Sequence, residues 1–169
     1  MTKKAEASPF TIISDTREQH GWTFPDDQLV ISAALPAGDY SISGYENVIA
    51  IERKSLSDLV NTVIHDRDRF FRELVKLKSY RRKAVVVEAS VADVFEMRYK
   101  SEAHPHSILG AVQSFHLTFD VPFLWWHSRE YSQWMAQRWL EQAWKRAVKW
   151  EERERLEAEK LVATEETVD

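Results

Sequence analysis

Gly38-Asp39-Tyr40 is followed by Ile51-Glu52-Arg53-Lys54 and then by Asp58. Glu52 and Lys54 have the same parity, so in an extended chain both project from one face of a strand, while the residue between them points the other way. An acid after a turn, a second acid on the following strand and a lysine two residues later can hold a divalent cation beside an activated water. This spacing therefore favours a metal site built on a strand–turn–strand unit.

Each member of this pattern has a simpler interpretation when it is taken alone. Asp39 after a glycine can be a turn residue, and Glu52 with Lys54 can be an exposed pair of charges on a strand. Asp58 can be an acid in the first turn of a helix, where the helix dipole favours it. The order and spacing of these residues nevertheless favour joint use, and together they indicate metal-dependent hydrolysis of phosphodiester bonds.

The chain has 169 residues, of which 44% are hydrophobic, and this length predicts one domain with a sizeable core. No run approaches the roughly 18 consecutive apolar residues of a membrane helix, so we expect no membrane association. Residues 1–9 contain no apolar stretch, so no secretory signal is expected. The chain has no cysteine, which excludes disulfides and thiolate metal sites. We therefore expect a cytoplasmic protein, associated with the nucleoid if it is bacterial.

The net charge of −4 conceals an uneven distribution. Residues 151–169 hold eight acids against three bases, whereas residues 52–83 hold ten Lys or Arg against five Asp or Glu. A basic surface beside an acidic motif is typical of a site that binds a polyanion, although a solvated helix face would give the same count. We predict that residues 151–169 form an acidic tail, helical or disordered, and that residues 1–9 form a disordered N-terminus.

Apolar periodicity and turn residues predict the secondary structure. The predicted strands cover residues 10–15, 29–35, 40–43, 48–53, 84–87 and 122–126. The predicted helices cover about residues 56–78, 91–99, 107–119 and 130–161. Ser55 or Ser57 can cap the first of these helices. The order of these elements predicts an α/β sandwich with a mixed sheet.

Six of the seven tryptophans lie between Trp125 and Trp150. On the last predicted helix, large apolar side chains such as Trp134 and Trp139 recur about once per turn. We expect this stripe to pack against the sheet over the first turns of the helix. From Trp144 onwards the stripe can instead pass beyond the domain and form a surface for a partner.

Three ordered motifs resemble the nuclease domain of the XPF family of structure-specific endonucleases. The motifs are Asp15-Thr16-Arg17-Glu18, Gly38-Asp39-Tyr40 and Ile51–Leu59. The family signature is Gly-Asp, a spacer, Glu-Arg-Lys, three residues and Asp, and this sequence matches each position. The similarity continues through Arg69–Leu74 and Ala84–Glu88, and residues 104–108 and 121–122 also resemble stand-alone bacterial and phage members. The resemblance covers about residues 10–145.

This resemblance implies a restriction-endonuclease-like α/β fold of the PD-(D/E)xK type, with a mixed sheet flanked by helices and a long C-terminal helix. The nuclease domain would span residues 10–150. The resemblance also implies Mg²⁺ or Mn²⁺ as cofactor and cleavage of DNA at branches or at junctions of duplex and single strand. Such cleavage would serve DNA repair, recombination or phage DNA processing, and the nuclease domains would pair as a homodimer.

The chain departs from the family in one respect. Nothing after the long helix resembles the tandem helix-hairpin-helix module with which many members grip DNA. Two explanations of substrate choice therefore stay open. Either a partner protein supplies the DNA targeting, or this chain cuts with low specificity.

The resemblance assigns roles to individual residues. It implies that Asp39 and Glu52 are the primary metal ligands and that the backbone carbonyl of Arg53 completes the coordination shell. Asp15 would bind the metal directly or through water. Lys54 would orient or deprotonate the attacking water and neutralise charge on the phosphate.

Further charged residues would hold the ligands or the phosphate in place. They are Arg17, Glu18, Arg53 and Asp58. Arg69 and Arg67 would contact the DNA backbone. An inward arginine such as Arg17 or Arg53 can instead form a salt bridge with a neighbouring carboxylate.

A catalytically silent DNA-binding scaffold or partner subunit is the alternative, because some family members have lost activity. Inactive members lose the acids or the lysine. This sequence keeps all of them, namely Asp15, Asp39, Glu52 and Lys54, and this retention favours an enzyme. An exonuclease or a nickase would use the same residues, so both stay open beside an endonuclease.

Overall fold

The computed structural model describes the backbone of residues 8–165 and the side chains of residues 8–161. The segment 1–9, predicted to be disordered, lies almost entirely outside the described residues, as does the end of the predicted acidic tail. The strands are β1 Ile12–Asp15, β2 Val30–Ala33, β3 Tyr40–Ile42, β4 Ile49–Lys54, β5 Arg82–Val87 and β6 Phe123–Trp125. The helices are α1 Leu56–Ile64, α2 Arg67–Lys78, α3 Val91–Phe95, α4 Pro105–Phe119 and α5 Arg129–Glu165. Every one of these strands falls on a predicted strand.

The strands form one mixed sheet in the order β2-β1-β3-β4-β5-β6. The short turn at Gly44 joins β3 to β4 as an antiparallel hairpin, and β1 lies antiparallel to β3 on its other side. From β4 onwards the pairing is parallel, because α1 and α2 connect β4 to β5 and α3 and α4 connect β5 to β6. The prediction of an α/β fold with a mixed sheet is therefore confirmed.

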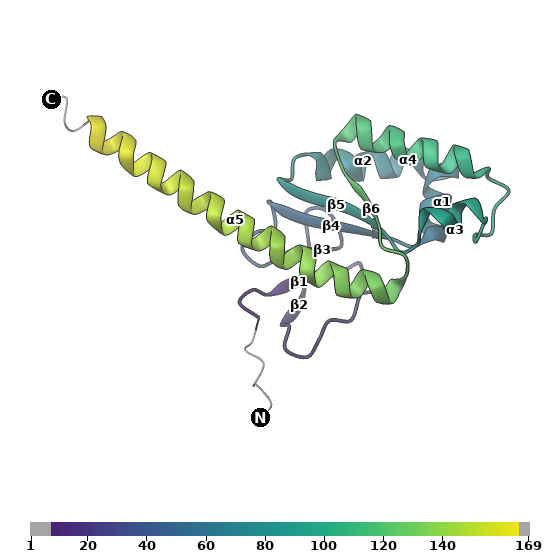
Figure 1. Ribbon diagram of the computed structural model, residues 1–169, viewed down its shortest axis with the longest axis horizontal. Coiled ribbons are helices and arrows are strands. Elements are labelled where there is room, and N and C mark those ends of the chain that lie inside the picture. The colour runs from purple at the N-terminus through teal and green to yellow at the C-terminus, as the bar shows by residue number, and fades with distance from the viewer. Residues whose placement is uncertain (1–7, 166–169) are drawn as a thin grey trace.

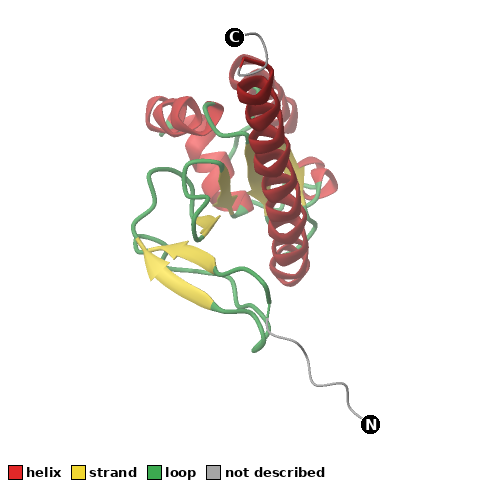
Figure 2. Ribbon diagram, turned by 90° about the vertical axis from the view of Figure 1, so that its left-hand side faces the viewer, coloured by secondary structure: helices red, strands yellow, loops and turns green. Residues whose placement is uncertain are grey.

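Helices cover the two faces of this sheet unequally (Figure 1). One face packs against α5 through Ile12, Tyr40, Ile51 and Val86, which share a core cluster with Ala136 and Leu140 of the helix. We call it the α5 face. Figure 2 shows α5 lying along this side of the strands. The opposite face carries α2 and α4 over Ala50 and Val85, and α1 lies beside them. We call it the cleft face, because it holds the candidate site.

The predicted single helix over residues 56–78 is wrong, because the chain forms two helices there. α1 ends at Ile64, and α2 begins at Arg67. Between them, Asp66 has the non-helical angles φ −113° and ψ 26°. The break lets α1 bury Leu59 in one core cluster and α2 bury Leu74 in another. A continuous helix could not turn both apolar faces toward the same sheet.

Small residues make the buried stripe of α5. Ala136, Leu140, Ala143 and Ala147 are buried against the sheet, whereas Trp134 is 54% exposed. The two tryptophans at the far end also lie on the body of the domain. The ring centroid of Trp144 lies 5.6 Å from that of Phe10, and the guanidinium of Arg81 lies 3.6 Å from the centroid of Trp150. The expectation of core packing over the first turns is thus confirmed for Leu140 and for the partly buried Trp139, and it is wrong for Trp134.

Those contacts also correct the idea of a partner surface from Trp144 to Trp150, since both rings are engaged within the chain. Beyond them, residues 151–161 are exposed on all sides of α5, and this part of the helix extends away from the sheet (Figure 1). Among the residues that the structure describes, no helix is long and apolar enough to cross a membrane.

Candidate active site

The quoted motifs meet in one open cleft of about 350 Å³. Its wall comes from the end of β1, the turn before β3, β4 and the first turns of α2. The lining residues are Asp15, Arg17, Pro36, Ala37, Gly38, Asp39, Glu52, Arg69, Glu73 and Lys76. Four of these residues are acids and three are bases. A cleft of this composition can hold both a cation and a phosphate.

Gly38 brings Asp39 against β4. Its φ is +76°, and a Cβ at this position would lie 2.8 Å from the carbonyl oxygen of Ile51. Only glycine combines this backbone conformation with so close an approach. The N–H of Asp39 donates to that same Ile51 oxygen at 2.7 Å, and the N–H of Arg53 donates to Asp39 Oδ2 at 2.7 Å. The turn therefore fixes both the backbone and the carboxylate of Asp39.

Glu52 and Lys54 project from the same face of β4, as their parity predicts. Lys54 Nζ lies 2.9 Å from Glu52 Oε1 and 3.7 Å from Glu73 Oε2, and 4.8 Å from the centroid of the Phe70 ring. Both side chains are buried. Burial lowers the pKa of Lys54, but the Glu52 and Glu73 carboxylates outweigh it and raise the pKa above its usual value. Lys54 thus keeps its proton in this arrangement.

Asp39 and Glu52, the two acids at the centre of the cleft, lie in an environment that disfavours their ionised forms. Burial and the neighbouring Glu52 carboxylate raise the pKa of Asp39 from 3.8 to about 8. Burial likewise raises the pKa of Glu52, although Lys54 opposes the shift. Lys54 is a single cation that lies near two acids, Glu52 and Glu73. Glu73 Oε2 is buried without a hydrogen-bond partner. The cleft therefore has an excess of carboxylate that a further cation would neutralise.

A divalent cation fits the chemistry of this donor set. Among the described residues, no three His, Cys, Asp or Glu side chains stand ready in a metal-binding arrangement. Asp39 and Glu52 are nevertheless hard oxygen ligands, and the raised pKa of Asp39 marks a carboxylate that lacks a cationic partner. Mg²⁺ and Mn²⁺ prefer such oxygens and keep several waters beside a few protein ligands.

Asp15 lies at the edge of the same cleft but is engaged with Arg17. Its Oδ1 accepts from the backbone N–H and Nε of Arg17 at 2.8 and 2.7 Å. Its Oδ2 accepts from an Arg17 terminal nitrogen at 3.0 Å and from the N–H of Leu35 at 2.7 Å. The hydrogen bonds from Arg17 lower the pKa of Asp15 to about 2. In this structure the Asp15 carboxylate is thus satisfied within the protein.

Arg53 and Glu18 lie on the α5 face, away from the cleft. Arg53 Nε donates to Glu18 Oε2 at 3.1 Å, and a terminal Arg53 nitrogen donates to Glu88 Oε2 at 2.8 Å. The Arg53 side chain is only 8% exposed. Of the two roles implied for Arg53 and Glu18, holding the phosphate does not match the position of their side chains, whereas holding the metal ligands in place stays a prediction. The alternative of a salt bridge to a neighbouring carboxylate describes Arg53 here, and it describes Arg17 as well.

The remaining predicted residues are divided between cleft and surface. Arg69 lines the cleft. Arg67 instead packs its guanidinium 5.5 Å from the ring centroid of Phe71, on the other side of α2. Asp58 is an acid in the first turn of α1, where its N–H donates to the Ser55 cap at 3.1 Å and its carboxylate accepts from the Ser55 hydroxyl at 2.6 Å. Asp58 is outside the cleft lining, so its position agrees with the simpler interpretation.

Three charged residues at or behind the site were missed by the sequence reasoning. Glu73 follows Arg69 by four residues, which places both on one face of a helix, and this spacing could have identified it. Glu88 and Arg129 stand behind the cleft, on the α5 face. No local pattern links them to β4, because their contacts join residues that are far apart in the chain.

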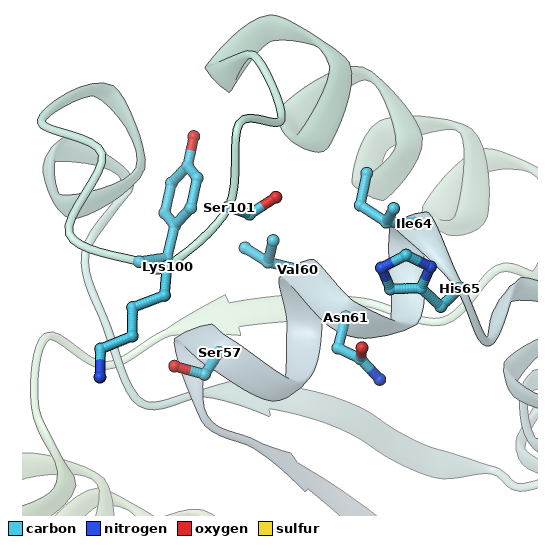
Figure 3. A pocket seen from close by; sticks show the side chains of 8 residues that line it. Ser57, Val60, Asn61, Ile64, His65, Lys100 and Ser101 are labelled. Carbon is cyan, nitrogen blue, oxygen red and sulfur yellow. The ribbon is translucent and has the colours of Figure 1, made fainter.

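A second hollow, of about 240 Å³, lies between α1 and the segment 99–101 (Figure 3). Its lining includes Ser57, Asn61, His65 and Lys100 but no carboxylate. It therefore lacks the oxygen ligands that the first cleft offers to a cation.

Comparison with known proteins fits this geometry. The family model described as ERCC4 domain matches residues 15–137, which include all three motifs and the whole cleft. The chain belongs to the ERCC4 domain family. The resemblance to XPF nucleases in the sequence is thereby confirmed.

Solved structures show the ERCC4 fold as well. XPF from Aeropyrum pernix is similar with a TM-score of 0.63 and 20% identity, over 84% of this chain and 69% of that chain. XPF from Aeropyrum pernix in complex with DNA gives the same TM-score and identity, over 80% of this chain and 66% of that one. This chain thus spans about two thirds of the length of those proteins. At this identity the likeness confirms the restriction-endonuclease-like fold and no more. No curated protein matches the sequence.

Proposed function

We propose that this ERCC4 domain protein is a metal-dependent endonuclease that hydrolyses phosphodiester bonds in DNA. One observation carries the proposal: Asp39 and Glu52 line a cleft edged by cations, and the buried Lys54 pairs with Glu52 at 2.9 Å. Membership of the ERCC4 family supports the same activity. The alternative of a silent scaffold gives no reason for two carboxylates and a lysine to be buried together at the cost of their hydration.

In this proposal Asp39 and Glu52 hold Mg²⁺ or Mn²⁺. When bound, the ion lowers the pKa of a water molecule and neutralises charge on the phosphate. Arg53 holds Asp39 Oδ2 toward the cleft through its backbone N–H and contributes its carbonyl as a further ligand. Asp15 contributes directly or through water, and direct contact requires Arg17 to release one carboxylate oxygen.

Lys54 acts as a charged donor in this proposal. Since the carboxylates around it raise its pKa, its ammonium is protonated at neutral pH and has no lone pair with which to accept a proton. Of the two roles suggested by the sequence, neutralising charge on the scissile phosphate is therefore favoured over deprotonating water. Glu52 and Glu73 fix the ammonium at the floor of the cleft.

The substrate in this proposal is DNA with a branch or a junction of duplex and single strand. Arg17, Arg69 and Lys76 line the cleft and are suited to phosphates on either side of the cut. The related Aeropyrum pernix XPF has been solved in complex with DNA, which supports this class of ligand. DNA repair, recombination or phage DNA processing would supply such junctions, and a DNA-targeting partner protein would restrict the choice of substrate.

We further propose that the protein is a homodimer. An apolar hollow on α4 and β6, next to Leu117, Phe123 and Trp125, offers a surface for a second copy. Leu117 is 82% exposed, which is unusual for a side chain of this size without a partner. Light scattering coupled to size exclusion would show a dimer for the wild type and a monomer for Leu117→Glu. A monomeric wild type would exclude this pairing.

Cleavage of labelled DNA tests the proposed function. Duplex, single-stranded, flap and fork DNA would be incubated with Mg²⁺, Mn²⁺ or EDTA. We expect metal-dependent cutting by the wild type and by Asp58→Ala, whose side chain lies outside the cleft, and none by Asp39→Ala or Lys54→Ala. If the wild type binds these substrates but cuts none of them, the protein is a scaffold and the proposal is wrong.

A further inference from the structure

Four charged side chains form a continuous chain of ion pairs on the α5 face, behind the cleft. They are Glu18, Arg53, Glu88 and Arg129, and we call them the rear network. Arg53 contacts Glu18 at 3.1 Å and Glu88 at 2.8 Å, and Arg129 contacts Glu88 at 3.4 Å. The side chains of Glu18, Arg53 and Glu88 are each at most 8% exposed. Two acids thus balance two bases, and of the four side chains only that of Arg129, which is 38% exposed, reaches water.

Burying these charges is costly. Taking an ion out of water costs several kcal/mol, and apolar residues of the same size often give equal or greater stability. A buried network therefore does more to fix geometry than to stabilise the fold. The Trp22 indole N–H, which donates to Glu88 Oε1 at 2.6 Å, adds a further constraint on the position of Glu88.

Glu88 holds the end of β4 at two successive residues. Its backbone N–H donates to the carbonyl of Lys54 at 2.9 Å, while its side chain accepts from the guanidinium of Arg53 at 2.8 Å. The backbone N–H of the same Arg53 points toward the turn before β3 and donates to Asp39 Oδ2 at 2.7 Å. Arg53 therefore links Glu88 directly to the carboxylate of Asp39.

Arg129 extends this link to α5 and to the loop after β1. As the first residue of α5, it contacts Glu88 and also donates to the backbone carbonyls of His20 and Gly21. The same loop carries Glu18 on the α5 face and begins with Arg17, which holds Asp15 in the cleft. The rear network therefore connects the segments that carry the acids of the site.

We infer that Glu88 is a positioning residue: it fixes Arg53 from behind the sheet, so that the Arg53 N–H holds the Asp39 carboxylate ready for a divalent cation. The effect of Glu88 on metal affinity rests on the function proposed above. The effect of Glu88 on the backbone at Arg53 does not rest on it, because that effect concerns the metal-free protein alone.

Glu88→Gln tests the inference with little change in shape. The single amide oxygen can accept from Arg53 or from the Trp22 indole but not from both, so the change removes one acceptor together with the negative charge between two arginines. We expect hydrogen exchange of the Arg53 amide, followed by NMR in EDTA, to become at least about tenfold faster. We also expect the Kd for Ca²⁺, measured by calorimetry, to rise about tenfold, which is the lower end of the effect of partners that orient metal ligands.

Leu140→Ala is the matched control, because Leu140 is fully buried in the α5 layer but takes no part in the network. We expect Leu140→Ala to lower overall stability. The exchange rate of the Arg53 amide, measured relative to the amides of Ile49 and Ile51 in the same strand, should stay as in the wild type, and so should the Kd for Ca²⁺. The double variant with Arg129→Gln removes the excess positive charge, and it restores part of the Ca²⁺ affinity.

The outcomes separate the inference from the proposed function. If Glu88→Gln leaves both exchange at Arg53 and Ca²⁺ affinity unchanged, or alters them no more than Leu140→Ala does, Glu88 has no positioning role. If the wild type binds none of Mg²⁺, Mn²⁺ and Ca²⁺, the proposed function fails, and the exchange rate at Arg53 alone decides whether Glu88 positions this backbone.

Discussion

Replacement of Asp39 by asparagine is predicted to stabilise the metal-free protein at pH 8 and to abolish cleavage. The pKa of Asp39 is raised from 3.8 to about 8 in the folded chain. An unfolded chain loses this proton near its ordinary pKa, whereas the folded chain keeps it until about pH 8. The raised pKa therefore costs stability progressively as the pH rises from about 4 to about 8. Asparagine cannot ionise, so the variant escapes this cost.

The size of the effect follows from the pKa shift. Each pH unit in this window is worth about 1.4 kcal/mol, so the change from pH 5 to pH 8 gives a ceiling of about 4 kcal/mol. Relaxation around the carboxylate and its sharing of charge with Glu52 reduce this value, and we expect about 2–4 kcal/mol. The asparagine oxygen still accepts from the N–H of Arg53, so the turn at Gly38 is preserved.

Urea unfolding in EDTA at pH 5 and at pH 8 measures this effect. The control is Asp26→Asn, an exposed residue outside the cleft, which should shift stability equally at both pH values. The advantage of Asp39→Asn over the wild type in free energy of unfolding should be about 2–4 kcal/mol larger at pH 8 than at pH 5. Added Mg²⁺ should then stabilise the wild type and leave Asp39→Asn unaffected. An equal difference from wild type at both pH values would refute the reasoning, because the carboxylate would then carry no ionisation cost.

Three further substitutions test other parts of the site. Gly38→Ala should cost about 2–3 kcal/mol in urea unfolding, because its φ is +76° and the new Cβ would meet the Ile51 carbonyl. Arg69→Ala should lower the slope of log K against log salt for DNA binding by about one, while Arg67→Ala, which removes a cation packed on Phe rings, should leave it unchanged. Asp15→Asn should lower the free energy of unfolding by about 2 kcal/mol at pH 7, because the lowered pKa of Asp15 stabilises the fold above about pH 4. This stabilisation disappears toward pH 2, so an equal loss of stability at pH 2 would contradict the prediction.

The cleft could be predicted from the sequence because its geometry is local. Strand parity alone places Glu52 and Lys54 on one face. A glycine followed by an acid predicts the turn that places Asp39 at the site, and the structure shows the close approach of Gly38 to β4. These relations depend on a few neighbouring residues, so no knowledge of the tertiary structure is needed to derive them.

The partners of Arg53 could not be predicted in this way. Its contacts with Glu18 and Glu88 each span 35 residues, and the contact between Glu88 and Arg129 spans 41. Tertiary packing alone brings these residues together. The same holds for the break between α1 and α2: no glycine or proline marks Asp66, and the helix ends there because two apolar faces must meet one sheet.

The alternation of β4 explains why the Glu-Arg-Lys triplet works as a unit. Residues 52 and 54 face the cleft, and residue 53 faces α5, so one strand carries the chemistry on one side and its support on the other. A shift of the strand by a single residue would exchange the two sides and place the arginine in the cleft. The ion pairs of Arg53 with Glu18 and Glu88 oppose this shift, because the shift would break both of them. In the proposed function the arginine side chain therefore supports the site from the α5 face, and only the Arg53 backbone would take part in the chemistry.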